Sequence, residues 1–158
     1  MKKSIESYSL ILLTITLMAF SGINWTVNDA ELKEAEAIRE VLLEGYVHGA
    51  FNELNPEAMS ETFHEDFAIF SPNGNEIQKY PISNWLESTR QRKQNPEFDP
   101  QKNVWDPEFV NISVSGNAAS VTLELHHQGK HVYTDYLSLL KFEDGWKVVA
   151  KVYHQHSS

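Results

Sequence analysis

The sequence contains no cysteine among its 158 residues, which excludes disulfide frameworks, thiol catalysis and cysteine-ligated metals. Basic residues are also few, since 13 Lys and Arg stand against 22 Asp and Glu, for a net charge of −9. Proteins that bind nucleic acid neutralise phosphates with clustered Lys and Arg, so this balance argues against a nucleic-acid partner. The sequence also lacks a phosphate-cradling glycine loop, a serine nucleophile elbow and a zinc-protease helix motif.

The first 21 residues differ in kind from the rest of the chain. Lys2 and Lys3 precede an apolar run over residues 10–20, and Ala19 and Ser21 are small residues at the two cleavage subsites. This is the pattern of a secretory signal peptide, and the run is short for a membrane span, which needs about 20 apolar residues. We therefore expect residues 1–21 to be removed and the protein to be periplasmic or secreted, with no stable membrane span after cleavage. An uncleaved anchor is the alternative.

The rest of the chain divides into a short N-terminal segment, residues 22–29, and one domain, residues 30–156. Apolar residues at helical spacing predict a first helix that contains Gly45 and Gly49, whose lack of side chains indicates close approach to a neighbouring element. A short helix, a hairpin, a third helix and a four-strand meander follow. This order predicts an α+β domain, in which helices cover one side of a strongly bent antiparallel sheet.

The turns of the meander predict how its strands pair. Asp144-Gly145 is typical of a two-residue hairpin turn, and it would place Asp135 opposite His154. A three-residue loop, Gln128 to Lys130, would place Leu123 opposite Asp135 and make one continuous apolar face. Asp135 is then the only carboxylate on that inner face, with His154 as its neighbour, while Lys151 faces solvent opposite Ser138.

Asp135 and His154 are therefore the first candidate site. A carboxylate on an apolar face is costly unless it is paired, so the two residues can form a buried ion pair, orient a ligand, or act as a general acid/base pair. His154 and His156 with Asp135 also form a set of metal-ligand type, but His156 lies at a chain end that frays, and we expect no metal or other cofactor. His126, His127 and His131 flank a turn and are expected to be exposed to solvent.

Aromatic residues provide a second group of candidates. Tyr46, Trp85, Trp105 and Tyr133 can line the mouth of a pocket, where they would contact a ligand together with Asp135 and His154. Ordinary core packing beneath a curved sheet is the alternative for each of them.

Three stretches carry a resemblance to a known superfamily: Phe63-His-Glu-Asp-Phe67, Asp135-Tyr-Leu-Ser-Leu and Asp144-Gly-Trp-Lys-Val. With the order of elements, they resemble the nuclear transport factor 2-like superfamily over residues 30–156, and within it the putative lumazine-binding group, alongside SnoaL-like polyketide cyclases and ketosteroid isomerases. The resemblance implies a cone-like half barrel covered by N-terminal helices, a scaffold that hosts enzymes, binders and dimerisation modules. Ketosteroid isomerases carry a catalytic Asp before a Pro at the end of the first strand. Ser71 precedes Pro72 here, so we do not expect that chemistry.

Three functions remain open at this point. The first is an exported, non-catalytic domain that binds a small, partly apolar molecule, and the second is a cyclase- or isomerase-type enzyme that uses Asp135 and His154. The third is a homodimeric interaction module without a ligand. Its interface would be the outer face of the sheet, which is predicted to carry Tyr136, Leu140, Val149 and Tyr153. A homodimer is expected under any of the three.

Overall fold

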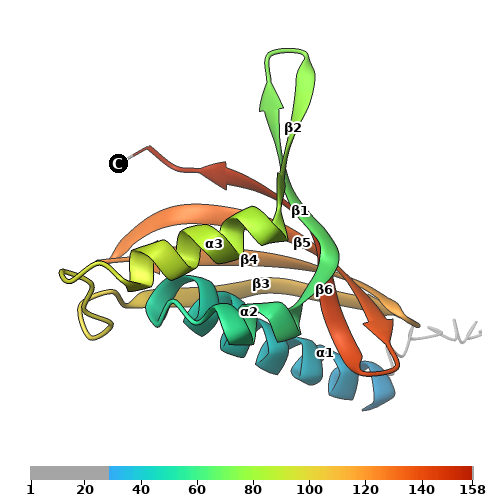
Figure 1. Cartoon of the computed structure of the whole chain (residues 1–158). Coiled ribbons are helices and arrows are strands. Elements are labelled where there is room, and N and C mark those ends of the chain that lie inside the picture. The colour runs from blue at the N-terminus through green and yellow to red at the C-terminus, as the bar shows by residue number, and fades with distance from the viewer. Residues whose placement is uncertain (1–28, 158) are drawn as a thin grey trace, which may run out of the picture.

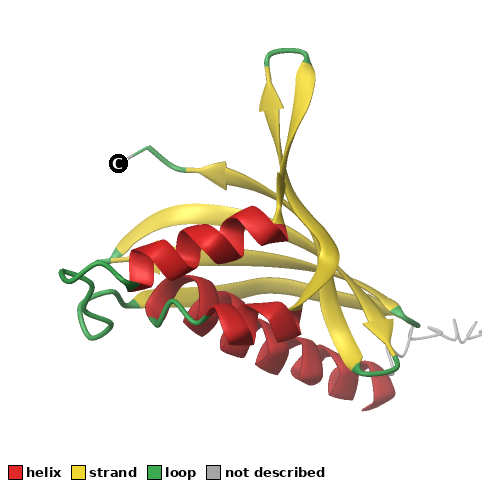
Figure 2. Ribbon diagram, in the orientation of Figure 1, coloured by secondary structure: helices red, strands yellow, loops and turns green. Residues whose placement is uncertain are grey.

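The computed structural model describes residues 29–157, so the predicted signal peptide and most of the segment that follows it lie outside the described residues. Helices lie on one side of a strongly curved sheet, in the α+β arrangement expected from the sequence (Figures 1 and 2). The described helices are α1 (Asp29–Val41), the π-helix η1 (Leu42–Asn52), α2 (Pro56–Thr62) and α3 (Ile82–Lys93). Within residues 29–157 no helix combines the length and the apolar character needed to cross a membrane.

Six strands form one sheet that does not close into a barrel: β1 (Phe63–Asn73), β2 (Glu76–Pro81), β3 (Trp105–Ser115), β4 (Ala118–His127), β5 (Lys130–Phe142) and β6 (Gly145–Gln155). Their order is β2-β1-β6-β5-β4-β3, and neighbours are antiparallel except β1 and β6, which are parallel. The β1–β2 hairpin projects beyond the body of the sheet (Figure 1).

The core lies between the helices and the concave face of the sheet. Along α1 and η1 the buried residues recur every four positions, as Ile38, Leu42 and Tyr46. Gly45 allows η1 to approach α2, because a Cβ atom built on it would lie 1.9 Å from Thr62 Oγ1. The close approach predicted from the two glycines is therefore confirmed.

The strand pairing is less regular than the turns predict. Four of the five strand pairs contain a shift in register, and β-bulges of this kind bend a strand and increase its twist. The predicted pairing of Leu123 with Asp135 is confirmed, although a bulge lies between that pair and the turn. On β3, Phe109 pairs with Leu123 and Asn111 with Thr122, so Val110 is the extra residue of a bulge.

The predicted pairing between β5 and β6 is wrong. The chain turns at Glu143-Asp144 rather than at Asp144-Gly145, because Phe142 pairs with Gly145. Leu139 pairs with Val148 and Ser138 with Ala150, so Val149 is the extra residue of a bulge.

This bulge changes the candidate site in two ways. Asp135 pairs with Tyr153, whereas His154 pairs with Thr134 on the outer face, so the predicted Asp135–His154 pair does not form. Lys151, predicted to face solvent, pairs with Leu137 and points into the protein, where it is only 4% exposed.

Candidate ligand-binding site

A buried ion pair connects β5 to β6 on the concave side of the sheet. Lys151 Nζ lies 2.7 Å from Asp135 Oδ1, and the two side chains are 5% and 0% exposed. Burial removes both charges from water, which costs free energy, so each charge depends on the other for compensation. Burial lowers the pKa of Lys151 below its ordinary value, and the Asp135 carboxylate partly offsets that change.

Tyr46 connects this pair to the helix layer. It lies in η1 and is fully buried, its hydroxyl donates a hydrogen bond to Asp135 Oδ2, and Lys151 Nζ donates to the Tyr46 oxygen. Burial, followed by the Asp135 charge, raises the pKa of Tyr46 well above its ordinary value. At neutral pH Tyr46 therefore keeps its proton and acts as a fixed donor to Asp135.

Aromatic rings surround the Lys151 ammonium. Its Nζ lies 5.0 Å from the ring centroid of Tyr46, 5.1 Å from that of Tyr153, and 5.8 to 5.9 Å from those of three further rings, Phe51, Trp85 and Tyr133. A cation within about 6 Å of a ring centroid is attracted by the electrons of the ring face. The rings therefore help to keep a charged lysine in a largely apolar environment.

A cavity of about 380 Å³ lies above this ammonium. Its wall combines apolar and aromatic side chains with polar ones, among which Ser71, Gln78 and Arg92 come from β1, β2 and α3. Lys151 lines it directly, whereas Asp135 and Tyr46 are not among the lining residues and hold Lys151 from below. No Asp or Glu of the described residues lines it.

The structure brings together four of the six residues that the sequence singled out for ligand binding. Trp85 and Tyr133 line the cavity, and Tyr46 and Asp135 lie beneath it. Trp105 is stacked on Tyr133 at a centroid distance of 5.8 Å and is not part of the lining, and His154 lies on the outer face.

Sequence reasoning missed Lys151, Phe51 and Arg92. Regular alternation along β6 placed Lys151 on the solvent side, and the bulge at Val149 reverses that alternation. Two features of the sequence indicate instead that Lys151 faces inward. Val148 and Val149 are consecutive apolar residues, which breaks a period of two, and a lone inward carboxylate at Asp135 needs a cation nearby.

The site sits in a fold with solved relatives. Residues 33–154 match the family described as putative lumazine-binding. The chain belongs to this family. Similar solved structures, both described as NTF2-like proteins of unknown function, come from Shewanella baltica OS155, with 27% identity, and Methylobacillus flagellatus KT, with 25% identity. Their TM-scores are 0.63 and 0.58, and the matches cover 80% of this chain and 97% and 94% of the respective relatives.

These matches confirm the nuclear transport factor 2-like, cone-like fold and its putative lumazine-binding group. A structure from Silicibacter pomeroyi DSS-3, also described as an NTF-2 like protein of unknown function, shares the fold at 21% identity with a TM-score of 0.61, covering 79% of this chain and 98% of that one. None of the curated proteins matches this chain. Membership in this family indicates a ligand-binding domain, and the ligand has to be argued from the residues of the cavity.

The buried ion pair between Asp135 and Lys151 predicts how substitutions change the free energy of unfolding. We expect Asp135→Asn to lower the free energy of unfolding by about 3 kcal/mol, because it leaves a buried ammonium without its counter-charge. Lys151→Met should cost a similar amount for the converse reason. The double variant Asp135→Asn/Lys151→Met should cost clearly less than the sum of the two, as measured by urea unfolding at pH 7.

Lys102→Met is the matched control for this cycle. This substitution breaks a solvent-exposed ion pair in which Lys102 Nζ lies 3.0 Å from Asp99 Oδ2. We expect no measurable change in the free energy of unfolding. Strict additivity of the two core substitutions would contradict the coupling between Asp135 and Lys151.

Proposed function

We propose that this protein is an exported domain that binds a small, partly apolar anion in the cavity above Lys151 and carries out no chemistry on it. The observation that carries the proposal is the charge of the cavity wall. Lys151 and Arg92 both line the cavity, and no acidic residue of the described chain does, although the sequence as a whole has a net charge of −9. Because Asp135 compensates the charge of Lys151, Arg92 supplies the net positive charge of the wall, and this charge favours an anion in the cavity over a neutral or cationic molecule of the same shape.

Lys151 is positioned to bind an anionic group. An ammonium has three N–H groups; within residues 29–157 Lys151 donates one to Tyr46, and Asp135 Oδ1 lies 2.7 Å from Nζ as an ion pair. An N–H that neither partner uses can donate to a ligand oxygen in the cavity. Because its partners and the surrounding rings fix the ammonium in place, it loses little freedom when a ligand binds.

Arg92 provides a second cation, from the last turn of α3. The pKa of Tyr133 is raised above its ordinary value, first by burial and then by the charges of Tyr153 and Asp135. The positive charge of Arg92 opposes that rise, so Arg92 acts electrostatically on this part of the cavity wall. A guanidinium can bind a carboxylate through two parallel hydrogen bonds. The aromatic wall and a volume of about 380 Å³ suit a ligand with one or two rings and one acidic group.

The arrangement supports binding rather than catalysis. Asp135 is covered by Lys151 and Tyr46 and does not line the cavity, so it is not in a position to take a proton from a bound molecule. The enzyme alternative assigned proton transfer to Asp135 and His154, and that pair does not form.

A pair of matched probes tests the ligand class. By isothermal titration, 1-naphthoate should bind the wild-type protein about tenfold more tightly than 1-naphthamide, since one charge-assisted hydrogen bond is worth more than 1.4 kcal/mol. Arg92→Gln should weaken binding of the acid by about tenfold and leave binding of the amide unchanged. Arg90→Gln removes the same charge from the same helix outside the cavity and should change neither. Equal affinity for the acid and the amide in the wild-type protein would contradict the proposal.

We also propose that the protein forms a homodimer through the outer face of its sheet. Tyr136 and Val152 pair across β5 and β6 and are 51% and 48% exposed, and Leu140 on the same face of β5 is 41% exposed. One of the four residues predicted for this face is corrected, because Tyr153 lines the cavity, and Val149 is the extra residue of the bulge. Exposed apolar side chains gathered on one face form a patch that a second copy can cover.

Sedimentation velocity at micromolar concentration tests the dimer. The wild-type protein should sediment as a dimer, and Tyr136→Lys should convert it to a monomer. Ile77→Lys, which replaces an apolar residue that is 77% exposed at the far end of the β1–β2 hairpin, should leave the dimer intact. A monomeric wild-type protein would rule the dimer out.

Export rests on the N-terminal pattern of residues 1–21. The full-length chain expressed in a bacterial host should be recovered outside the cytoplasm with Gly22 as its first residue, as determined by N-terminal sequencing. Recovery of a chain that retains Met1 would show that the pattern does not act as a cleaved signal.

A further inference from the structure

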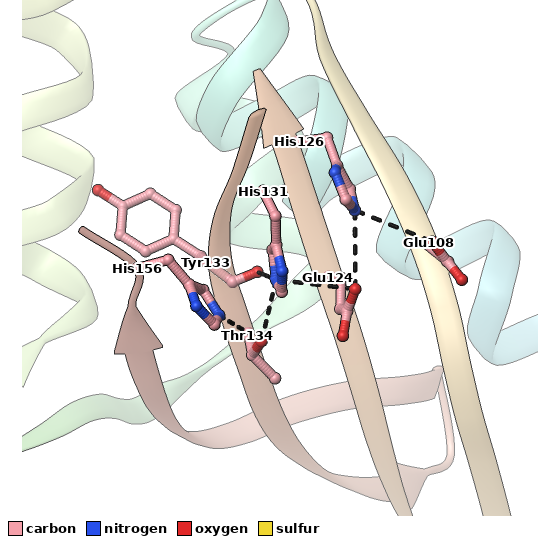
Figure 3. Close-up of polar contacts among 7 residues, drawn as sticks. All are labelled: Glu108, Glu124, His126, His131, Tyr133, Thr134 and His156. Carbon is pink, nitrogen blue, oxygen red and sulfur yellow. Dashed lines mark hydrogen bonds and ion pairs between the residues drawn. The ribbon is translucent and has the colours of Figure 1, made fainter. Parts of the chain in front are cut away.

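The outer face of the sheet carries a row of imidazoles and carboxylates that the proposed function does not use. The row runs across β3, β4 and β5 and ends just after β6 (Figure 3). Its members are Glu108, Glu124, His126, His131, Thr134 and His156. Leu123 and Asp135 face inward, so alternation along the strands places their neighbours Glu124 and Thr134 on the opposite side of the sheet from the cavity.

The two carboxylates of the row face each other directly. Glu108 on β3 pairs with Glu124 on β4, and like charges placed opposite each other destabilise an antiparallel pair. Glu124 is 28% exposed, so solvent screens its charge only in part. A positive charge between the two side chains would relieve this repulsion.

His126 points at both carboxylates without bonding to either. Its Nε2 lies 3.7 Å from Glu124 Oε2 and 3.9 Å from Glu108 Oε2, which is too far for a hydrogen bond. That nitrogen is also buried and has no hydrogen-bond partner among the described residues. Buried polar atoms are nearly always satisfied, so an unpartnered one that faces two carboxylates indicates a missing partner.

The spacing fits a metal ion. One ligand atom from each of Glu108, Glu124 and His126 lies within 4.8 Å of the other two. Zinc binds histidine nitrogen and carboxylate oxygen at about 2.0 to 2.2 Å, so the ligand atoms of a tetrahedral site are about 3.4 Å apart. The two distances from His126 exceed this by only a few tenths of an ångström, which side-chain rotation can close.

We propose that Glu108, Glu124 and His126 bind a divalent transition metal ion, with zinc as the favoured ion. One imidazole and two carboxylates are a donor set that zinc accepts, and three protein ligands leave a fourth position open. The ligands come from two adjacent strands, β3 and β4, which keep one register from the Trp105–His127 pair to the Phe109–Leu123 pair.

His131, on the neighbouring strand β5, supports one of the three ligands without being a ligand itself. Its Nε2 lies 3.7 Å from Glu124 Oε2, 3.0 Å from Thr134 Oγ1 and 3.1 Å from the Tyr133 carbonyl oxygen. These contacts hold the ring beside Glu124, where it restricts the rotation of a ligating carboxylate. Outer partners of this kind orient the ligands of metal sites.

Equilibrium dialysis with zinc chloride tests the site in residues 22–158, the chain expected after signal cleavage, prepared without a polyhistidine tag. The wild-type protein should bind one zinc ion per chain, and cobalt in its place should give the visible absorption of a four-coordinate ion. Glu108→Gln, at a residue whose side chain is 69% exposed, and His126→Gln should each weaken zinc binding by at least about tenfold.

His154→Gln is the matched control, because it removes an exposed imidazole of the same face outside the donor set. Zinc binding that is unchanged in this variant supports the assignment. A wild-type protein that binds no zinc would overturn it. Equal loss in the control would also overturn it, because the ion would then lie among the imidazoles of β6.

Discussion

The ion pair between Lys151 and Asp135 is the constraint on which the inner side of this protein depends. Two charges removed from water are tolerated only when each compensates the other and further hydrogen bonds are made. Tyr46 provides those bonds from η1, so the pair fixes β5, β6 and the helix layer relative to one another. Four of the five aromatic rings around the ammonium, all except Tyr46, then line the cavity.

The bulge at Val149 makes this arrangement possible. In a regular ladder Lys151 would face solvent and Val152 would face the core, and the single extra residue exchanges the two. The same shift moves His154 away from Asp135 to the outer face. A bulge thus determines which residue compensates the buried carboxylate and which residues remain for the surface.

The limits of sequence reasoning on this chain follow from such irregularities. The order of elements, the helix-covered sheet and the inward position of Asp135 are predictable, because they rest on long periodic patterns and on turn residues. The residue opposite Asp135 is not predictable in the same way, because one inserted residue reverses every side chain beyond it. The two consecutive apolar residues Val148 and Val149 are the only local mark of that insertion. The π-helical geometry of η1, which positions Tyr46, is likewise hidden, because its apolar residues still recur every four positions.

The two faces of the sheet have opposite electrostatic character. The concave face offers cations to a cavity that no acidic residue among residues 29–157 lines, and the convex face places two carboxylates and an unpartnered imidazole side by side. The two proposed sites, for an anion within the cone and for a metal ion on its outer surface, therefore lie on different faces of one sheet. Family membership gives the scaffold, and these residues give this chain its own chemistry.

A crystal structure of residues 22–158, purified without denaturation and crystallised with 1-naphthoate, would show how Lys151 is held and what it binds. We expect a bulge at Val149, Lys151 Nζ between Asp135 and Tyr46, and the carboxylate of the probe bound to Lys151 and Arg92. A regular β5–β6 ladder with Lys151 in solvent would contradict the proposed role of the ion pair. A cavity closed by Trp85 and Tyr153 around an unliganded lysine would contradict the proposed anion site.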